Sequence, residues 1–129
     1  MNLNQITVPV SDVERSIRFY EKLGLRLSVQ SLPTYARFEC PEGNSTFSLH
    51  QVDLMPVGDG IWVYFEVQNP DEIVNELIGK GIVFEEMPNN KPWLWREARL
   101  KDPDNNQIIS YFAGSNRANP PWRMVSKNL

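Results

Sequence analysis

The sequence predicts an α+β fold built from two βαβββ modules, which form a curved mixed sheet with the helices on its outer face. Three observations predict it. Segments of alternating apolar and polar residues indicate strands, and two segments combine a helix-capping pattern with apolar residues at helical spacing. The order of one strand, one helix and three strands then occurs twice within 129 residues. Such an order favours helices packed on the convex face of a sheet, with a cleft on the concave face.

The first module begins with a strand over residues 4–10, where apolar and polar side chains alternate. Ser11 follows as the expected N-cap residue, with Glu14 three residues later, so the pattern predicts a helix. Gly24 is expected to end this helix. Three further strands are predicted, over residues 25–29, 35–40 and 46–52.

The second module repeats these signals. Residues 62–67 alternate in polarity and predict a strand. Asn69 is the expected N-cap of the second helix, with Pro70 at its first position and Glu72 three residues after the cap. Glycines ending at Gly81 are expected to stop this helix. Three further strands are predicted, over residues 83–86, 95–101 and 107–112.

The domain organisation follows from this repeat. Residues 1–113 are expected to form a single domain, with modules at about 3–53 and 60–113. Residues 114–129 are polar and include Pro120-Pro121-Trp122, so we expect an irregular tail that packs loosely or reaches a partner subunit.

Composition excludes several classes of protein. With 41% hydrophobic and 22% charged residues, the chain is typical of a globular domain. A net charge of −3 argues against nucleic acid as a partner, because phosphate binding needs a basic face. No apolar run approaches the ~18 residues of a membrane-spanning helix, and we expect no secretory signal. A single cysteine, Cys40, suits a reducing cytoplasm, where we expect the protein to be located.

Three motifs resemble one known family. The first is residues 6–16, Ile-Thr-Val-Pro-Val-Ser-Asp-Val-Glu-Arg-Ser, and the second is Phe65-Glu66-Val67. The third is residues 96–100, which lead into Asp102-Pro103-Asp104 and Asn106. Together they resemble the vicinal oxygen chelate superfamily, which includes the glyoxalase, bleomycin-resistance and extradiol-dioxygenase families. The resemblance covers about residues 3–113 and implies the same paired βαβββ fold. It also implies a small-molecule ligand and a homodimer.

The resemblance further implies where a metal ion would bind. Metal-dependent members place His, Glu or Gln side chains on the first and last strands of each module, and the ion polarises substrate oxygens. Here these positions hold Gln5, Ser48, Trp62 and Ile109, with Phe47 in place of Ser48 if the register shifts by one residue. One amide, one hydroxyl, one indole and one alkyl group do not form a normal divalent site. We therefore expect neither a bound metal nor another cofactor, and we assign no catalytic residue.

Alternation along the strands places a different set of side chains on the concave face. Aromatic walls stack planar or cationic ligands, and Glu39, Glu97 or Glu66 could supply a counter-charge. Arg37 and Arg99 could bind a carboxylate, or pair with Glu39 and Glu97 across strands. The expected ligand-binding residues are Gln5, Thr7, Tyr35, Arg37, Ser48, His50, Trp62, Tyr64, Trp95, Glu97, Ile109 and Tyr111.

These observations favour a metal-free binding protein that resembles bleomycin-resistance proteins and sequesters a planar or cationic ligand, as in antibiotic resistance. One alternative is a glyoxalase-type metal-dependent lyase, isomerase or dioxygenase whose atypical site recruits Gln5, His50 or Glu97. Another is an interaction module whose cleft is filled by its own aromatic side chains and whose tail docks on a partner. His50 is the only histidine, and we expect an exposed or hydrogen-bonded strand residue, with an acid–base group near the cleft as the alternative.

Overall fold

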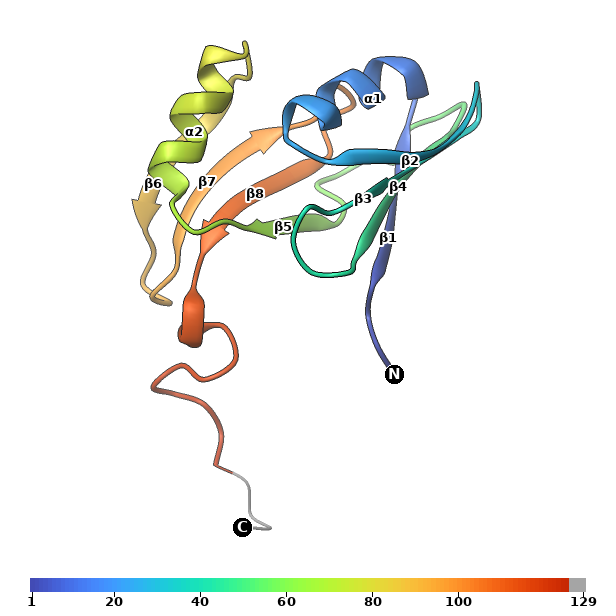
Figure 1. Cartoon of the computed structure of the whole chain (residues 1–129). Helices are drawn as coiled ribbons and strands as arrows, with labels where there is room; N and C mark the ends of the chain where they lie inside the picture. The colour runs from blue at the N-terminus through green and yellow to red at the C-terminus, as the bar shows by residue number, and fades with distance from the viewer. Residues whose placement is uncertain (126–129) are drawn as a thin grey trace. The chain divides into compact units, whose positions relative to one another are not determined.

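The computed structural model describes residues 1–125, and the last four residues of the predicted tail lie outside the described residues. The order of elements is βαβββ, given twice (Figure 1). The first module consists of β1 (Gln5–Val10), α1 (Val13–Lys22), β2 (Arg26–Ser31), β3 (Tyr35–Glu39) and β4 (Thr46–Gln51). The second consists of β5 (Trp62–Glu66), α2 (Pro70–Gly79), β6 (Phe84–Asn90), β7 (Arg96–Lys101) and β8 (Gln107–Phe112). A 3₁₀ turn, η1 (Gly114–Asn116), follows β8.

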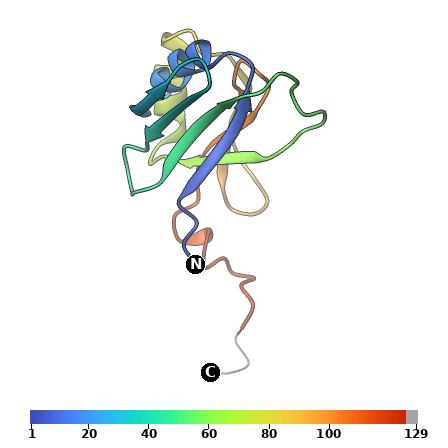
Figure 2. The ribbon, with the colours of Figure 1, turned by 90° about the vertical axis from the view of Figure 1, so that its right-hand side faces the viewer.

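Each module forms its own four-stranded sheet, with the orders β1-β4-β3-β2 and β5-β8-β7-β6. Strand β1 is parallel to β4 and lies beside it (Figure 2), whereas β3 is antiparallel to both β4 and β2. The sheets are therefore mixed, and the predicted α+β fold of two βαβββ modules is confirmed. None of the helices within residues 1–125 has the length and apolar character needed to cross a membrane.

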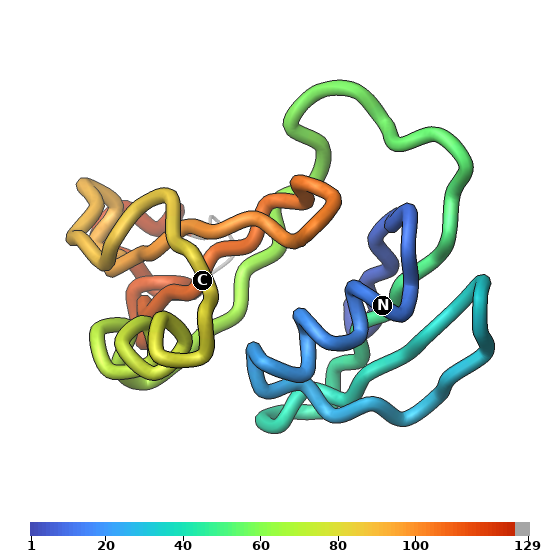
Figure 3. Tube along the Cα trace, turned by 90° about the horizontal axis from the view of Figure 1, so that it is seen from above, coloured from blue at the N-terminus to red at the C-terminus, as the bar shows by residue number. Residues whose placement is uncertain are grey.

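The chain divides into two compact units, which are described separately below. The first contains residues 1–62 and 101–107, and the second contains residues 63–100 and the chain from 108 onward. Within the first unit, residues 52–61 form a wide arc without helix or strand between β4 and β5 (Figure 3).

Two helix starts were predicted, and one needs correction. Asn69 caps α2 as expected, because its side chain accepts a hydrogen bond from the Glu72 N–H at 3.2 Å. At α1, however, the N-cap is Asp12 and not Ser11: its Oδ1 accepts from the Arg15 N–H at 3.1 Å. The Ser11 hydroxyl instead donates to Asp104 Oδ1 at 2.5 Å, so a contact distant in sequence takes it out of the cap.

Strand β6 extends to Asn90, four residues beyond the predicted end at 86. Pro88, Asn89 and Asn90 are typical of a turn, because proline has no N–H to donate to a neighbouring strand and asparagine is common in turns. The pairing of β6 with β7 shifts register twice over this stretch. Such bulges allow the backbone to continue as a strand past a proline.

The core of the first module packs α1 against one face of its sheet. Tyr20 of α1 is fully buried, and its ring centroid lies 4.7 Å from that of Phe47 and 6.0 Å from that of Phe38. Val10 and Leu49 are also fully buried. Burying these side chains, at ~1.5–3 kcal/mol each, gives this face its stability and leaves the opposite face of the sheet for polar groups.

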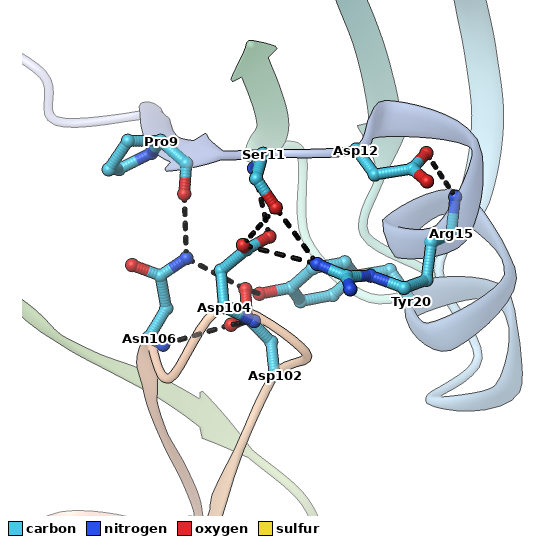
Figure 4. Close-up of polar contacts among 8 residues, drawn as sticks. All are labelled: Pro9, Ser11, Asp12, Arg15, Tyr20, Asp102, Asp104 and Asn106. Atoms are coloured by element: carbon cyan, nitrogen blue, oxygen red, sulfur yellow. Dashed lines mark hydrogen bonds and ion pairs between the residues drawn. The ribbon is translucent and has the colours of Figure 1, made fainter. Parts of the chain in front are cut away.

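The Tyr20 hydroxyl of α1 reaches into a buried cluster of polar groups (Figure 4). Asp102 is 3% exposed, and its carboxylate accepts from the Tyr20 hydroxyl at 2.7 Å. It also accepts from the backbone N–H groups of Asp104 and Asn106, both at 2.9 Å, and from the Asn106 side chain at 2.8 Å. The carboxylate therefore organises the 101–107 turn and ties it to α1.

The same turn holds the end of β1 and the start of α1 (Figure 4). Asp104 accepts from the Ser11 N–H at 3.1 Å and from Arg15 Nη2 at 3.1 Å. Asn106 donates its side-chain N–H to the Pro9 carbonyl at 2.9 Å. These contacts join the Asp102-Pro103-Asp104 motif to the β1–α1 motif in one structural unit.

This cluster predicts a loss of stability at alkaline pH. Burial, followed by the charge of Asp102, raises the pKa of Tyr20 well above its usual value. In the unfolded chain Tyr20 releases its proton near pH ~10. We expect its contribution to the free energy of unfolding to be complete below that pH and to decline above it, by up to ~1.4 kcal/mol per pH unit.

Urea denaturation of the wild type and Tyr20→Phe at several pH values measures this contribution. The wild type should be more stable by about 1 kcal/mol at pH 7. The advantage should shrink above pH ~10, because phenylalanine has no proton to release. An advantage that stays constant up to pH 11 would contradict the expected role of Tyr20.

Candidate functional site

The first unit presents a polar surface on the sheet face opposite α1. We call it the polar face of module one. It arises because buried residues alternate with polar ones along β1, β3 and β4, and because the strand register places Thr7 and Arg37 on either side of Ser48. Its members are Gln5, Thr7, Tyr35, Arg37, Thr46, Ser48 and His50.

Hydrogen bonds join the β1 and β4 members of this face. Gln5 Nε2 donates to Ser48 Oγ at 2.7 Å and to Thr7 Oγ1 at 3.1 Å. The Thr46 hydroxyl donates to Gln5 Oε1. Both ends of the Gln5 amide are thereby engaged by neighbouring side chains, and the amide is held in one orientation.

Strand β3 adds an arginine–tyrosine pair. The Tyr35 hydroxyl lies 2.7 Å from Ser48 Oγ and accepts from Arg37 Nε at 2.9 Å. Arg37 Cζ also lies 5.5 Å from the centroid of the Tyr35 ring. The hydrogen bond with Ser48, and after it the one from Arg37, lowers the pKa of Tyr35. Glu39 lies 3.9 Å from Arg26.

His50 and Cys40 lie at the margins of this arrangement. His50 is exposed and pairs in register with Tyr35 across β3 and β4. Cys40, which follows β3, is half-buried, and this burial raises the pKa of its thiol. A raised pKa lowers the thiolate fraction and suits an unreactive cysteine.

The second unit presents aromatic rings on the corresponding strands. Tyr64 of β5, Trp95 before β7 and Tyr111 of β8 form what we call the aromatic cluster. The Trp95 and Tyr111 rings are stacked, with centroids 4.9 Å apart and planes at 29°. Tyr64 meets Trp95 and Tyr111 edge-on, at 5.8 and 5.4 Å. Ile109 is fully buried beside them and forms an apolar base with Tyr111.

Accessible and buried rings have different roles in this cluster. Tyr64 is 40% exposed, and so is Trp62, which lies two residues earlier on the same side of β5. Trp95 is partly exposed, whereas Tyr111 is buried. Tyr64 and Trp95 can therefore contact a ligand, while Tyr111 packs against both rings and Ile109 lies in the same buried cluster.

A buried carboxylate lies near the rings. Glu97 of β7 is 2% exposed, and its Oε2 accepts from the Trp93 indole N–H at 2.6 Å. Burial, and after it the charge of Glu97, raises the pKa of Tyr64. Arg99 lies 3.9 Å from Glu86, which also pairs with Lys91. Glu97 therefore brings negative charge to the aromatic cluster.

The structure reveals contacts that the pattern did not predict. Glu66, considered above as a counter-charge, accepts from the N–H groups of Ala113 and Gly114 at 2.9 and 3.0 Å, and so caps η1. Trp95 donates its indole N–H to the Asn116 carbonyl at 3.3 Å. The start of the tail thus fixes the edge of the aromatic cluster. No local sequence signal marks either contact.

The donors at the four family positions do not fit a divalent ion. The Gln5 amide and the Ser48 hydroxyl are engaged with each other and with neighbours. An indole such as that of Trp62 offers no lone pair to a metal. Ile109 is a buried alkyl group. Within residues 1–125, no three or more His, Cys, Asp or Glu side chains gather at a place where they could hold an ion.

Comparisons with known proteins agree with this fold. The family model described as "Glyoxalase/Bleomycin resistance protein/Dioxygenase superfamily" matches residues 2–109. A comparison with curated protein sequences found no match.

Three solved structures illustrate the range of similar proteins. A glyoxalase/bleomycin resistance protein/dioxygenase from Nocardioides has a TM-score of 0.78 and 23% identity, covering 97% of this chain and 90% of its own. A lactoylglutathione lyase from Agrobacterium tumefaciens has a TM-score of 0.73 and 16% identity, covering 95% and 97%. TioX from Micromonospora sp. ML1 has a TM-score of 0.71 and 14% identity, covering 88% and 99%. At 14–23% identity, these similarities show a shared fold and nothing more.

Proposed function

We propose that this chain, which belongs to the Glyoxalase/Bleomycin resistance protein/Dioxygenase superfamily, sequesters a planar or cationic small molecule without a metal ion of its own. The observation that carries the proposal is the aromatic cluster, in which a supported and accessible Tyr64 ring lies beside Trp95. Aromatic walls with a few polar anchors are typical of small-molecule sites.

The rings suit a flat ligand for a physical reason. Two edge-on contacts hold the Tyr64 ring in place before a ligand binds. A ligand that stacks on this ring therefore costs little side-chain entropy. Each stacking or cation–π contact contributes about 0.5–2 kcal/mol. Trp62, exposed on the same side of β5, offers a second ring.

Glu97 supports a preference for cations. Its observed partner, the Trp93 indole, is a neutral donor, so this contact does not neutralise the carboxylate. A buried charge acts through a medium of low dielectric constant and attracts a cation more strongly than a charge in water does. A planar cation stacked on Tyr64 therefore gains from both the rings and the carboxylate.

The proposal is tested with ethidium, a planar cation, by calorimetry and by quenching of tryptophan fluorescence. We expect Tyr64→Ala to weaken binding about tenfold, because one stacking contact of roughly 1.4 kcal/mol is lost. Tyr64→Phe keeps the ring and should bind within about threefold of the wild type. Phenanthridine, which is planar and neutral, should bind more weakly than ethidium.

Two results would argue against this function. Equal affinity of the wild type and Tyr64→Ala for ethidium would remove the stacking role. Stoichiometric nickel, zinc, iron or manganese in the purified protein, measured by elemental analysis, would favour the metal-dependent lyase, isomerase or dioxygenase instead. The homodimer and the cytoplasmic location stay predictions, and light scattering measures the first of them.

A further inference from the structure

Arg37 differs from Arg15 and Arg26, two other arginines of the first unit, in what its guanidinium contacts. Arg15 lies 3.1 Å from Asp104 and Arg26 lies 3.9 Å from Glu39. Within the part of the chain that the structure describes, no carboxylate pairs with Arg37. Its Nε is instead held by the Tyr35 hydroxyl at 2.9 Å, and its guanidinium carbon lies 5.5 Å from the centre of that ring. The guanidinium is thereby oriented while its two terminal amino groups stay available.

The Tyr35 O–H is available to donate a hydrogen bond to a ligand. Ser48 is fully buried, its Oγ accepts from Gln5 Nε2 at 2.7 Å, and the Tyr35 oxygen lies 2.7 Å away. A buried hydroxyl needs an acceptor for its proton, so Ser48 donates to Tyr35. The Tyr35 oxygen then accepts from both Ser48 and Arg37, which leaves its O–H for a further acceptor. The lowered pKa of Tyr35 agrees with two donors to its oxygen.

We propose that Arg37 and Tyr35 bind the carboxylate of a small organic acid on the polar face of module one. Arg37 supplies its terminal N–H groups, and Tyr35 supplies its O–H. A planar guanidinium matches a carboxylate in shape, and such charge-assisted hydrogen bonds are about twice as strong as neutral ones. The polar network behind the pair holds both donors before the ligand arrives, which reduces the entropy lost on binding.

This inference rests on the proposed function for the claim that the protein binds small molecules, and it assigns the polar face of module one a ligand group of its own, a carboxylate. Two further side chains flank the Arg37–Tyr35 pair. His50, the register partner of Tyr35, presents an exposed imidazole. Glu39, two residues beyond Arg37 on β3, lies beside Arg26, which offsets its charge.

The test uses benzoate as the probe and benzamide as its neutral match, followed by NMR of protein labelled with ¹³C at the tyrosine Cζ. We expect millimolar benzoate to shift the Tyr35 signal and to raise the pKa of Tyr35, because a bound anion opposes the phenolate. Arg37→Gln should weaken benzoate binding at least tenfold, and Tyr35→Phe about three- to tenfold. Arg18→Gln, which removes the same charge from α1, should change binding less than twofold.

Three outcomes would overturn the inference: no benzoate binding to the wild type, equal binding of benzamide, or unchanged binding to Arg37→Gln. Chemical shifts of the core methyl groups show whether each variant is folded, and Tyr35→Phe repeats the test without altering charge. Ethidium titrations separate the two proposals. If the protein binds ethidium through Tyr64 but does not bind benzoate, only the carboxylate site is refuted. If it binds benzoate through Arg37 but ethidium binding does not depend on Tyr64, only the stacking function is refuted.

Discussion

Asp102→Ala is expected to lower the free energy of unfolding by about 3–5 kcal/mol. The carboxylate accepts hydrogen bonds from the Tyr20 hydroxyl, from two backbone N–H groups of its own turn and from Asn106 Nδ2. Alanine would leave these donors without an acceptor in a place where Asp102 is 3% exposed. Each stranded buried donor costs about 1–3 kcal/mol, reduced where water enters the gap.

Urea denaturation followed by far-UV circular dichroism measures this loss. Asp59→Ala is the matched control, because it removes an exposed aspartate of the same unit and should change stability by less than about 0.5 kcal/mol. Tyr20→Phe, which removes only one donor, should fall between the two. A loss below about 1 kcal/mol for Asp102→Ala would mean that the turn reorganises without the carboxylate.

Ile109→Glu should destabilise the protein by about 3–5 kcal/mol at pH 7. Ile109 is fully buried against Tyr111, Ala113 and Trp95. A carboxylate placed there loses its hydration and raises its own pKa. The position is one of the four at which the resemblance implies a metal ligand, so the substitution also measures how well this site tolerates a charged side chain.

Ile109→Gln is the control, because it has a similar size and no charge. A raised pKa in the folded state means that the Ile109→Glu variant keeps its stability below about pH 4.3 and loses it as pH rises. The difference between the two variants should therefore grow from pH 4 to pH 7 in urea denaturation. Equal stability at both pH values would indicate that water reaches this position.

The regular parts of the fold were predictable because their signals are local. The strand predicted over residues 107–112 coincides with β8, and Asn69 with Pro70 identified the start of α2. The start of α1 was misplaced by one residue, since Ser11 and Asp12 are both good capping residues. The choice between them depends on Asp104, 93 positions away in the chain.

For the candidate site, the sequence likewise predicted which residues lie together but not which atoms make contact. Period-two alternation placed Tyr35, Arg37 and Ser48 together, and the structure joins them by hydrogen bonds. Which atoms meet was not predictable, because side-chain partners depend on rotamers and strand register. Trp93 with Glu97 is such a contact: the pattern placed Glu97 among the ligand-binding residues, and the structure joins it to the Trp93 indole.

The 101–107 turn has a consequence for attempts to dissect the protein. The chain enters the second unit after residue 62, returns to the first for residues 101–107 and then leaves it again. A polypeptide truncated within the 52–61 arc would retain β1 to β4 yet lack Asp102, Asp104 and Asn106. The Tyr20 hydroxyl and the Ser11 N–H would then lose their carboxylate acceptors. The boundary between the two βαβββ modules is therefore not expected to be a boundary of independent folding.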